Sequence, residues 1–169
     1  FYRNFWSISL PLHPENYLEA WNGVKFYILN SIIVSGLSLI GVLFLASITS
    51  YVFTRFRFFG RDFLFYAIIS LLMVPGVLTL VPTFMIAKKL SLLDTRWVLI
   101  LPYISGGQVF AIFVLSAFFG TIPRDLFDAS AIDGAKEYQI LWHLVIPLSK
   151  PILGVVAIMN LLWTWNEFM

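Results

Sequence analysis

The sequence contains no cysteine, which excludes disulfide frameworks, thiolate metal sites and cysteine nucleophiles. Histidine is scarce as well: His13 and His143 are the two in the chain, and neither a His-Glu-x-x-His pattern nor a Gly-Lys-Ser/Thr phosphate loop occurs. Charged residues make up 12% of the chain, and its net charge of +2 is dispersed, which gives nucleic-acid binding no support. We therefore expect no catalytic residue, no metal site and no cofactor on this chain.

Hydrophobic residues, by contrast, make up 60% of the sequence, and its mean hydropathy is +0.88. Soluble globular domains are about 45–50% apolar. The excess lies in uncharged runs, and a helix of roughly 20 apolar residues can cross a bilayer. The pattern predicts an all-α integral membrane protein, a polytopic helix bundle, with spans near Val24–Thr54, Phe63–Ala87, Trp97–Gly120 and Pro151–Met169.

The two ends of the sequence bear on how much of the protein it represents. Residues 1–23 are polar and aromatic, and Pro11 and Pro14 oppose a helix there. This composition indicates an extramembrane segment with interfacial Trp and Tyr. The last apolar run still continues at Met169. We expect residues 1–169 to form one transmembrane domain that is truncated at both ends.

The segment Arg124–Lys150 is too polar for a span and too apolar for a simple loop. Its apolar residues recur at three- and four-residue steps, which predicts short amphipathic helices around Gly134. Such a helix could instead lie on the lipid headgroups, but its polar residues are mainly acidic, which suits an anionic surface poorly. With four spans, this segment and the Arg55–Arg61 turn fall on one side of the membrane. That side holds six of the eleven Lys and Arg residues, which narrowly favours the cytoplasm.

A spaced motif lies inside this segment. It runs Asp128-Ala129-Ser130-Ala131-Ile132-Asp133-Gly134 and ends with Leu144-Val145-Ile146-Pro147. It resembles the signature of binding-protein-dependent ABC importer permeases: Glu-Ala-Ala, three residues, Gly, nine residues, Ile, one residue, Leu-Pro. The spacing matches throughout, and the chain departs from the pattern at four chemically similar positions: Asp128, Ser130, Leu144 and Ile146.

Further matches extend the resemblance along the chain and favour the carbohydrate-uptake branch, of the maltose type. They are Asn30-Ser31, Arg55-Phe56-Arg57-Phe58 with Gly60-Arg61, Met73-Val74-Pro75, Leu101-Pro102-Tyr103, Ile122-Pro123-Arg124 and Trp165-Asn166. The resemblance implies a permease subunit of the bacterial inner membrane that forms half of a translocation path for a sugar or similar small polar solute. It also implies six spans in the whole chain, of which four fall in this sequence.

The resemblance further implies partners: a pair of ABC ATPase subunits that carry ATP and Mg, a second permease subunit, an extracytoplasmic solute-binding protein and membrane lipid. Residues 121–150 would be the cytoplasmic coupling segment that meets the ATPase. A glycine suits a turn with a backbone angle that other residues resist, and acidic residues can cap helix starts or pair with basic partner residues. The expected coupling residues are Asp128, Ala129, Ser130, Asp133, Gly134, Leu144, Ile146 and Pro147.

Polar or helix-breaking residues inside the apolar runs are candidates for a solute path, because polar groups are costly in lipid and broken helices recur at transport sites. Simple packing kinks remain an equal alternative for the Pro-Gly pair. The candidates are Pro75, Gly76, Gln108, Asn160 and Asn166. The depth of Glu167 stays open.

Two other classes of function compete with an ABC permease. An intramembrane enzyme would need a nucleophile with a base, or a metal cluster, within the spans, and both histidines lie outside them. An ATP-independent channel or secondary transporter would need charged relays or an internal repeat. The spans show neither feature, so the ABC permease is the preferred hypothesis.

Overall fold

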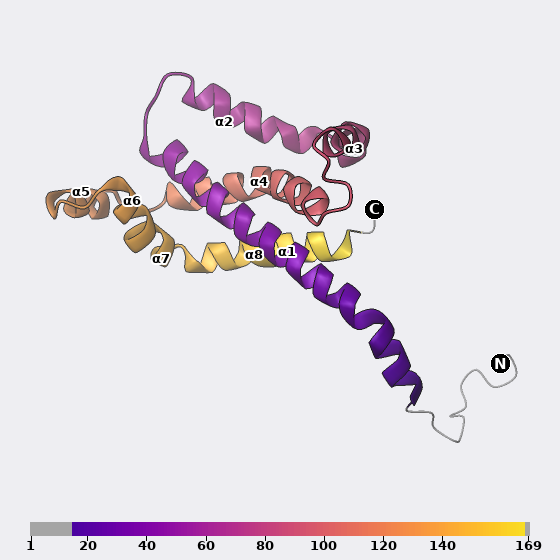
Figure 1. Ribbon diagram of the computed structural model, residues 1–169. Helices are drawn as coiled ribbons and strands as arrows, with labels where there is room; N and C mark the ends of the chain where they lie inside the picture. Colours follow the sequence, from indigo (N-terminus) through magenta and orange to yellow (C-terminus); the bar gives the residue numbers. More distant parts are fainter. Residues whose placement is uncertain (1–14, 168–169) are drawn as a thin grey trace, which may run out of the picture. The chain divides into compact units, whose positions relative to one another are not determined.

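The computed structural model describes residues 15–167, and in that part of the chain every regular element is a helix (Figure 1). This confirms the expected all-α fold. The α-helices are α1 (Glu15–Arg55), α2 (Arg61–Ser70), α3 (Leu80–Lys89), α4 (Trp97–Phe119), α5 (Arg124–Ile132), α6 (Glu137–Ile140), α7 (Ile146–Leu148) and α8 (Lys150–Asn166). Two 3-10 turns, η1 (Leu71–Met73) and η2 (Gly76–Thr79), lie between α2 and α3, and a π-helical stretch, η3 (Leu141–Val145), follows α6.

The chain separates into two compact units, residues 1–33 and 34–169, and α1 runs through the boundary between them. The 41 residues of α1 include the whole expected first span. Of the described helices, α1 and α4 are each long and apolar enough to cross a membrane. The number of candidate spans rises to four if each of two bent helix pairs is taken as one span.

The second expected span, Phe63–Ala87, is a bent pair rather than one helix. The first part, Arg61–Met73, meets the second, Gly76–Lys89, at an angle of 100°. Val74 and Pro75 at the break are both extended, with ψ of 116° and 128°. Proline has no N–H to donate and disfavours helical geometry in the residue before it, so the bend follows from the position of Pro75.

The last expected span, Pro151–Met169, falls in one helix, α8, and a bend at Ser149 lies directly before it. The helical stretch Glu137–Leu148 meets Lys150–Asn166 at 78°. Pro151 lies in the first turn of α8, where the missing N–H of a proline costs no hydrogen bond. Within the described residues α8 ends at Asn166; the final two residues of the expected span, 168 and 169, lie outside the described part, as do residues 1–14.

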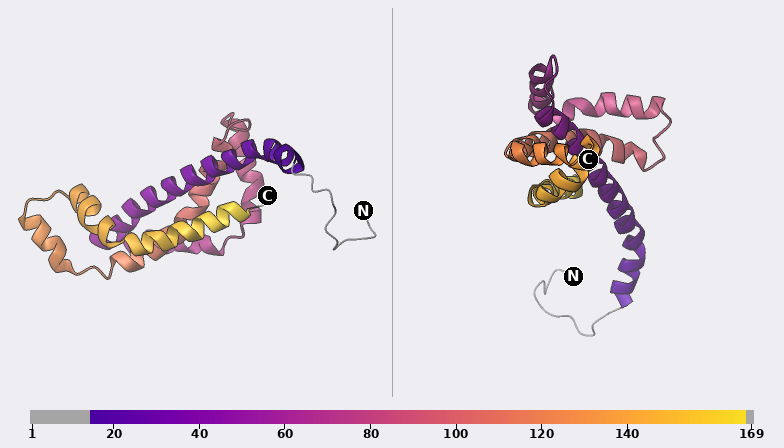
Figure 2. Two further views of the ribbon diagram at one scale, coloured as in Figure 1. Left: turned by 90° about the horizontal axis from the view of Figure 1, so that it is seen from below. Right: turned by 90° about the vertical axis from the view of Figure 1, so that its left-hand side faces the viewer.

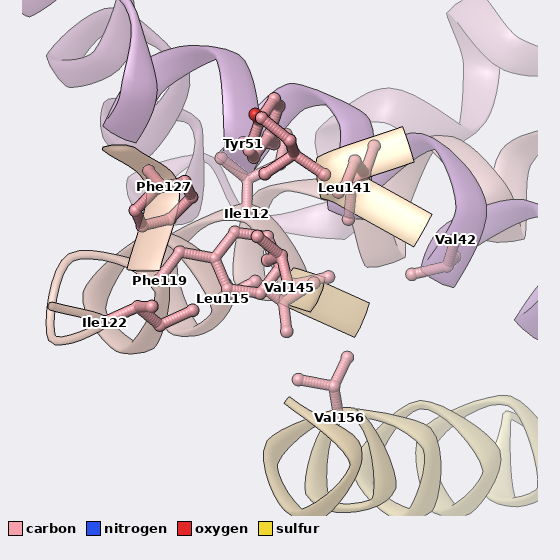
Figure 3. Close-up of a cluster of buried hydrophobic side chains, with 13 residues drawn as sticks. Val42, Tyr51, Ile112, Leu115, Phe119, Ile122, Phe127, Leu141, Val145 and Val156 are labelled. Carbon is pink, nitrogen blue, oxygen red and sulfur yellow. The ribbon is translucent and has the colours of Figure 1, made fainter. Parts of the chain in front are cut away.

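The core of the second unit forms where α1, α4 and α8 meet the segment from α5 to η3 (Figure 3). Helices α4 and α8 pack side by side (Figures 1 and 2). Small residues let helices approach closely, and Ala46 and Ala111 are completely buried. The core side chains are Val42, Ala46, Tyr51, Ala111, Ile112, Leu115, Phe119, Ile122, Phe127, Ile140, Leu141, Val145 and Val156.

The outer surface of the helices is apolar. Ile40, Phe84 and Ile158 are 65%, 56% and 60% exposed, which would be unfavourable in water. Large contiguous apolar surfaces mark contact with lipid or with other protein surfaces, as expected for a helix bundle that crosses a membrane.

At Gly107, α4 approaches side chains of both α1 and α8 closely. A Cβ added there would collide with Asn160 Oδ1 and lie 2.8 Å from Val42 Cγ2. We predict that Gly107→Ala lowers the free energy of unfolding by about 1–3 kcal/mol, the usual range for overpacking. Gly154→Ala in α8 is the matched control, because its Cβ would meet no atom within 4 Å.

The measurement is the thermal unfolding midpoint of each variant in detergent. The control should equal or slightly exceed the wild type, because alanine favours a helix over glycine by about 1 kcal/mol. An equal loss of stability in both variants would contradict the helix packing described above.

Candidate functional site

Most of the first half of the sequence motif lies on α5 and the turn that follows it. Proline at position 123 precedes the helix, and Asp125 lies in its first turn, where a carboxylate favours the positive end of the helix dipole. The helix ends in a Schellman motif: the Ala135 N–H donates to Ser130 O at 3.0 Å, and the Gly134 N–H donates to Ala131 O at 3.0 Å. Gly134 has φ of 78°, which confirms the expected positive-φ turn.

The surface of this helix and turn is exposed on one side and anchored on the other. Phe127 is buried at 7% exposure, whereas Ile132 at the end of α5 is 87% exposed. Asp128, Ala129 and Gly134 are exposed as well. In Figures 1 and 2 the orange α5 lies beyond the ends of α4 and α8. We call residues 124–134 the exposed helix–turn.

The C-terminal end of α1 holds this helix–turn in place. The Tyr51 hydroxyl donates a hydrogen bond to Glu137 Oε2 of α6, and Arg55 Nε lies 3.9 Å from Glu137 Oε1. The Arg55 guanidinium also lies 5.0 Å from the centre of the Phe127 ring, a cation–π contact. Tyr51 and Arg55 are four residues apart and therefore share one face of α1. We call these four residues the α1 anchor: Tyr51, Arg55, Phe127 and Glu137.

The sequence analysis did not identify the α1 anchor. It assigned Arg55 to a basic turn and gave Tyr51 no role. The spacing of Tyr51 and Arg55 at the end of a span was the available signal, but their partners lie far along the chain: Tyr51 and Glu137 are 86 residues apart. The ion pair itself contributes little, because half-exposed pairs are worth about 0–1 kcal/mol. The Arg55–Glu137 pair instead orients α6, and the contact between Arg55 and the Phe127 ring orients α5.

The second half of the motif packs against the core of the second unit. Leu144 and Ile146 are partly buried and pack against the core cluster, while Val145 between them is fully buried. A ring stack joins this region to α1, with the Phe44 and Trp142 centroids 5.8 Å apart. The motif therefore contains an exposed part, from Asp128 to Gly134, and a buried part that ties it to α1.

The solute-path candidates fall into three places. Asn160 is 6% exposed, donates to Val156 O at 3.0 Å and lies against Gly107. Gln108 reaches from α4 to the Val42 carbonyl of α1, at 3.3 Å. These two belong to the packing of α1, α4 and α8.

The other candidates lie apart from that packing. Pro75 and Gly76 are exposed at the 100° bend. Asn166 is exposed at the end of α8 and donates to Leu162 O. The assignment of these five residues to a solute path stays a prediction. Over residues 15–167, no group of three or more His, Asp or Glu side chains could hold a metal ion.

A bundle of apolar helices with one exposed polar helix–turn at its end defines a multi-pass helical membrane protein. A family comparison identifies it further. The chain belongs to the binding-protein-dependent transport system inner membrane components, whose family model matches residues 42–169. It is therefore an inner membrane component of a transport system.

Three of the relatives are named for the transport of a sugar. Diacetylchitobiose uptake system permease protein NgcG of Streptomyces coelicolor is 38% identical over 165 residues, which cover 95% of this chain and 55% of the relative. Galactooligosaccharides transport system permease protein GanQ of Bacillus subtilis is 34% identical over 156 residues, 88% of this chain and 55% of the relative. Arabinooligosaccharides transport system permease protein AraQ, also of Bacillus subtilis, is 30% identical over 158 residues, 92% and 56%. The chain spans about half the length of these relatives, and their names agree with the resemblance to the carbohydrate-uptake branch.

The α1 anchor makes a testable prediction. Tyr51→Phe removes the hydrogen bond to Glu137 and leaves the ring in place. We expect the free energy of unfolding to fall by about 1.5 kcal/mol, the low end for a hydrogen bond to a charged group, because water can reach the half-exposed carboxylate. Amide hydrogen exchange of residues 124–140 should accelerate.

Tyr66→Phe is the matched control, because the exposed Tyr66 makes a ring contact with Phe65 and, within the described part of the chain, its hydroxyl makes no hydrogen bond. It should leave exchange of residues 124–140 unchanged. Unchanged exchange in Tyr51→Phe would show that α6 does not depend on this bond.

Proposed function

We propose that this chain is the membrane-spanning permease subunit of an ATP-driven ABC importer and forms half of the path for a sugar or a similar small polar solute. It couples to a separate ATPase through the segment from Asp128 to Pro147, on the cytoplasmic face. The observation that carries the proposal is the exposed helix–turn: its motif residues face outward while Phe127 and the α1 anchor hold its inner side.

The anchoring suggests how movement passes from the ATPase to the membrane. A partner can shift an equilibrium only through contacts that differ between two states. The exposed helix–turn offers such contacts through Asp128, Ala129 and Gly134. A displacement of α5 is transmitted to α4 through Ile122 and Phe119, which share the core with Phe127. Through Glu137 the same displacement reaches α1. The spans then move as rigid helices.

The proposal includes partners that bind this chain. They are a pair of ABC ATPase subunits, a second permease subunit, an extracytoplasmic solute-binding protein and the surrounding lipid. ATP and Mg belong to the ATPase subunits, and no cofactor is proposed for this chain. The relatives named for diacetylchitobiose, galactooligosaccharides and arabinooligosaccharides support a carbohydrate as the solute.

Gly134 provides the sharpest test of coupling. In Gly134→Val the added Cβ would meet no atom of residues 15–167 within 4 Å apart from its chain neighbours, but the positive φ strains the backbone by roughly 1–2 kcal/mol. If the turn docks into the ATPase, the variant should lose most solute uptake or release the ATPase during purification, with membrane insertion intact. Asp128→Ala should act in the same direction more mildly.

Gly60→Val is the control for backbone strain. Gly60 has φ of 80° and equally open space around its Cβ position, and it lies outside the motif. It should suffer the same local strain yet keep the ATPase bound. Wild-type uptake and assembly in Gly134→Val would show that the coupling assignment is wrong.

The solute class needs its own measurement. Proteoliposomes that hold the full-length permease, its partner subunits and the binding protein should take up labelled oligosaccharides only when ATP is present, and the ATPase rate should rise with the loaded binding protein. Uptake of the same sugars without ATP would favour the alternative, a channel or secondary transporter. ATP-driven uptake of amino acids but of no sugar would contradict a carbohydrate solute.

A further inference from the structure

A cavity of about 980 Å³ opens between two segments that are far apart in the sequence. One wall is the end of α1, the connection after it and the start of α2; the other is the end of α4 and the start of α5. Its charged lining residues are Arg55, Arg57, Arg61, Asp62, Arg124 and Asp128. The fold thus gathers four arginines, against two aspartates, around one hollow.

The arginines differ in whether their charge is already compensated. Arg61 Nη2 lies 2.7 Å from Asp62 Oδ1, and Arg55 faces Glu137 and the Phe127 ring. Among residues 15–167, Arg57 and Arg124 have no hydrogen-bond or ion-pair partner, and both are exposed. Two uncompensated guanidinium groups on opposite walls of a hollow are suited to an anion, above all to the oxygens of a phosphate group.

The aromatic residues of the same region indicate what carries the anion. Phe56, Phe58 and Phe63 line the cavity. Phe59 beside it is completely exposed, and Phe63 is 77% exposed. Phe56, Phe58 and Phe59 follow directly on the apolar α1, and the ends of membrane spans are where basic side chains meet lipid headgroups. An acidic protein surface would satisfy the arginines but would leave exposed phenylalanines unexplained; a lipid offers a phosphate and acyl chains together.

We infer that this cavity binds the phosphate headgroup of an anionic phospholipid, with Arg57 and Arg124 as its principal ligands and with the neighbouring phenylalanines against the acyl chains. Basic pockets between membrane helices recognise such headgroups elsewhere. Because Arg124 begins α5, a lipid bound here contacts the exposed helix–turn from its membrane side. The inference does not depend on ATPase coupling, and lipid binding can be measured without transport.

The test is lipid retention by the assembled transporter that contains the full-length permease. The complex is extracted in mild detergent, titrated with phosphatidylglycerol or phosphatidylcholine, and analysed by native mass spectrometry. The wild type should prefer phosphatidylglycerol. Each basic side chain near an anionic lipid is worth about a fivefold change in affinity, so Arg57→Gln with Arg124→Gln should bind about 30-fold more weakly. Arg57→Lys with Arg124→Lys should retain part of the affinity, because the charge remains.

The control is Lys88→Gln with Lys89→Gln, which removes the same charge from two exposed lysines at the end of α3. It should bind phosphatidylglycerol as the wild type does. Equal retention in the Arg57/Arg124 variant and the wild type, or an equal loss in the lysine control, would overturn the inference. So would inorganic phosphate binding as tightly as the lipid, or release of the ATPase from the arginine variant with lipid retention unchanged, because the occupant would then be a free anion or the protein partner.

Discussion

The position of the exposed helix–turn depends on one contact region, the α1 anchor. A nine-residue helix such as α5 is too short to be stable alone in water. Burial of Phe127 supplies the apolar contact, and Arg55 covers the ring while it reaches Glu137. The Tyr51 hydroxyl binds the same carboxylate. One turn of α1 thus fixes both α5 and α6, so the short helices move with a long span instead of separately from it.

A second constraint concerns the polar side chains within α1, α4 and α8, of which some find hydrogen-bond partners inside the protein, whereas the buried Ser38 and Ser116 hydroxyls find none among the described residues. Hydrocarbon offers no hydrogen bonds, and an unpaired group there costs several kcal/mol. Ser50 donates to Ile112 O across the α1–α4 contact, and Gln108 donates to Val42 O in the opposite direction. The Asn160 side-chain amide donates to Val156 O of its own helix, and its Oδ1 lies in the space that a side chain at Gly107 would occupy. Hydrogen bonds from polar side chains therefore join α1 to α4, and the packing of Asn160 against Gly107 holds α8 to α4.

Several elements could be predicted from the sequence and others could not. The helical content and the two uninterrupted spans follow from run length, because backbone groups in lipid must pair within a helix. The bend at Pro75 follows from the chemistry of proline, but its angle of 100° does not. The bend at Ser149 lies between Pro147 and Pro151, and its angle of 78° likewise does not follow from the sequence. For the motif, the Schellman turn at Gly134 was predictable, whereas the burial of Val145 between two partly buried motif residues was not.

The sequence by itself determined the apolar spans, the family motif and the positive-φ turn at Gly134, since each depends on residues that are neighbours in the chain. The tertiary structure alone decided which spans touch and what holds the motif. Tyr51 and Glu137 come together across 86 residues, and the two walls of the arginine-lined cavity come from the ends of α1 and α4. Such pairings depend on how helices pack against each other, and packing depends on the shapes of both surfaces at once, which no local pattern along the sequence contains.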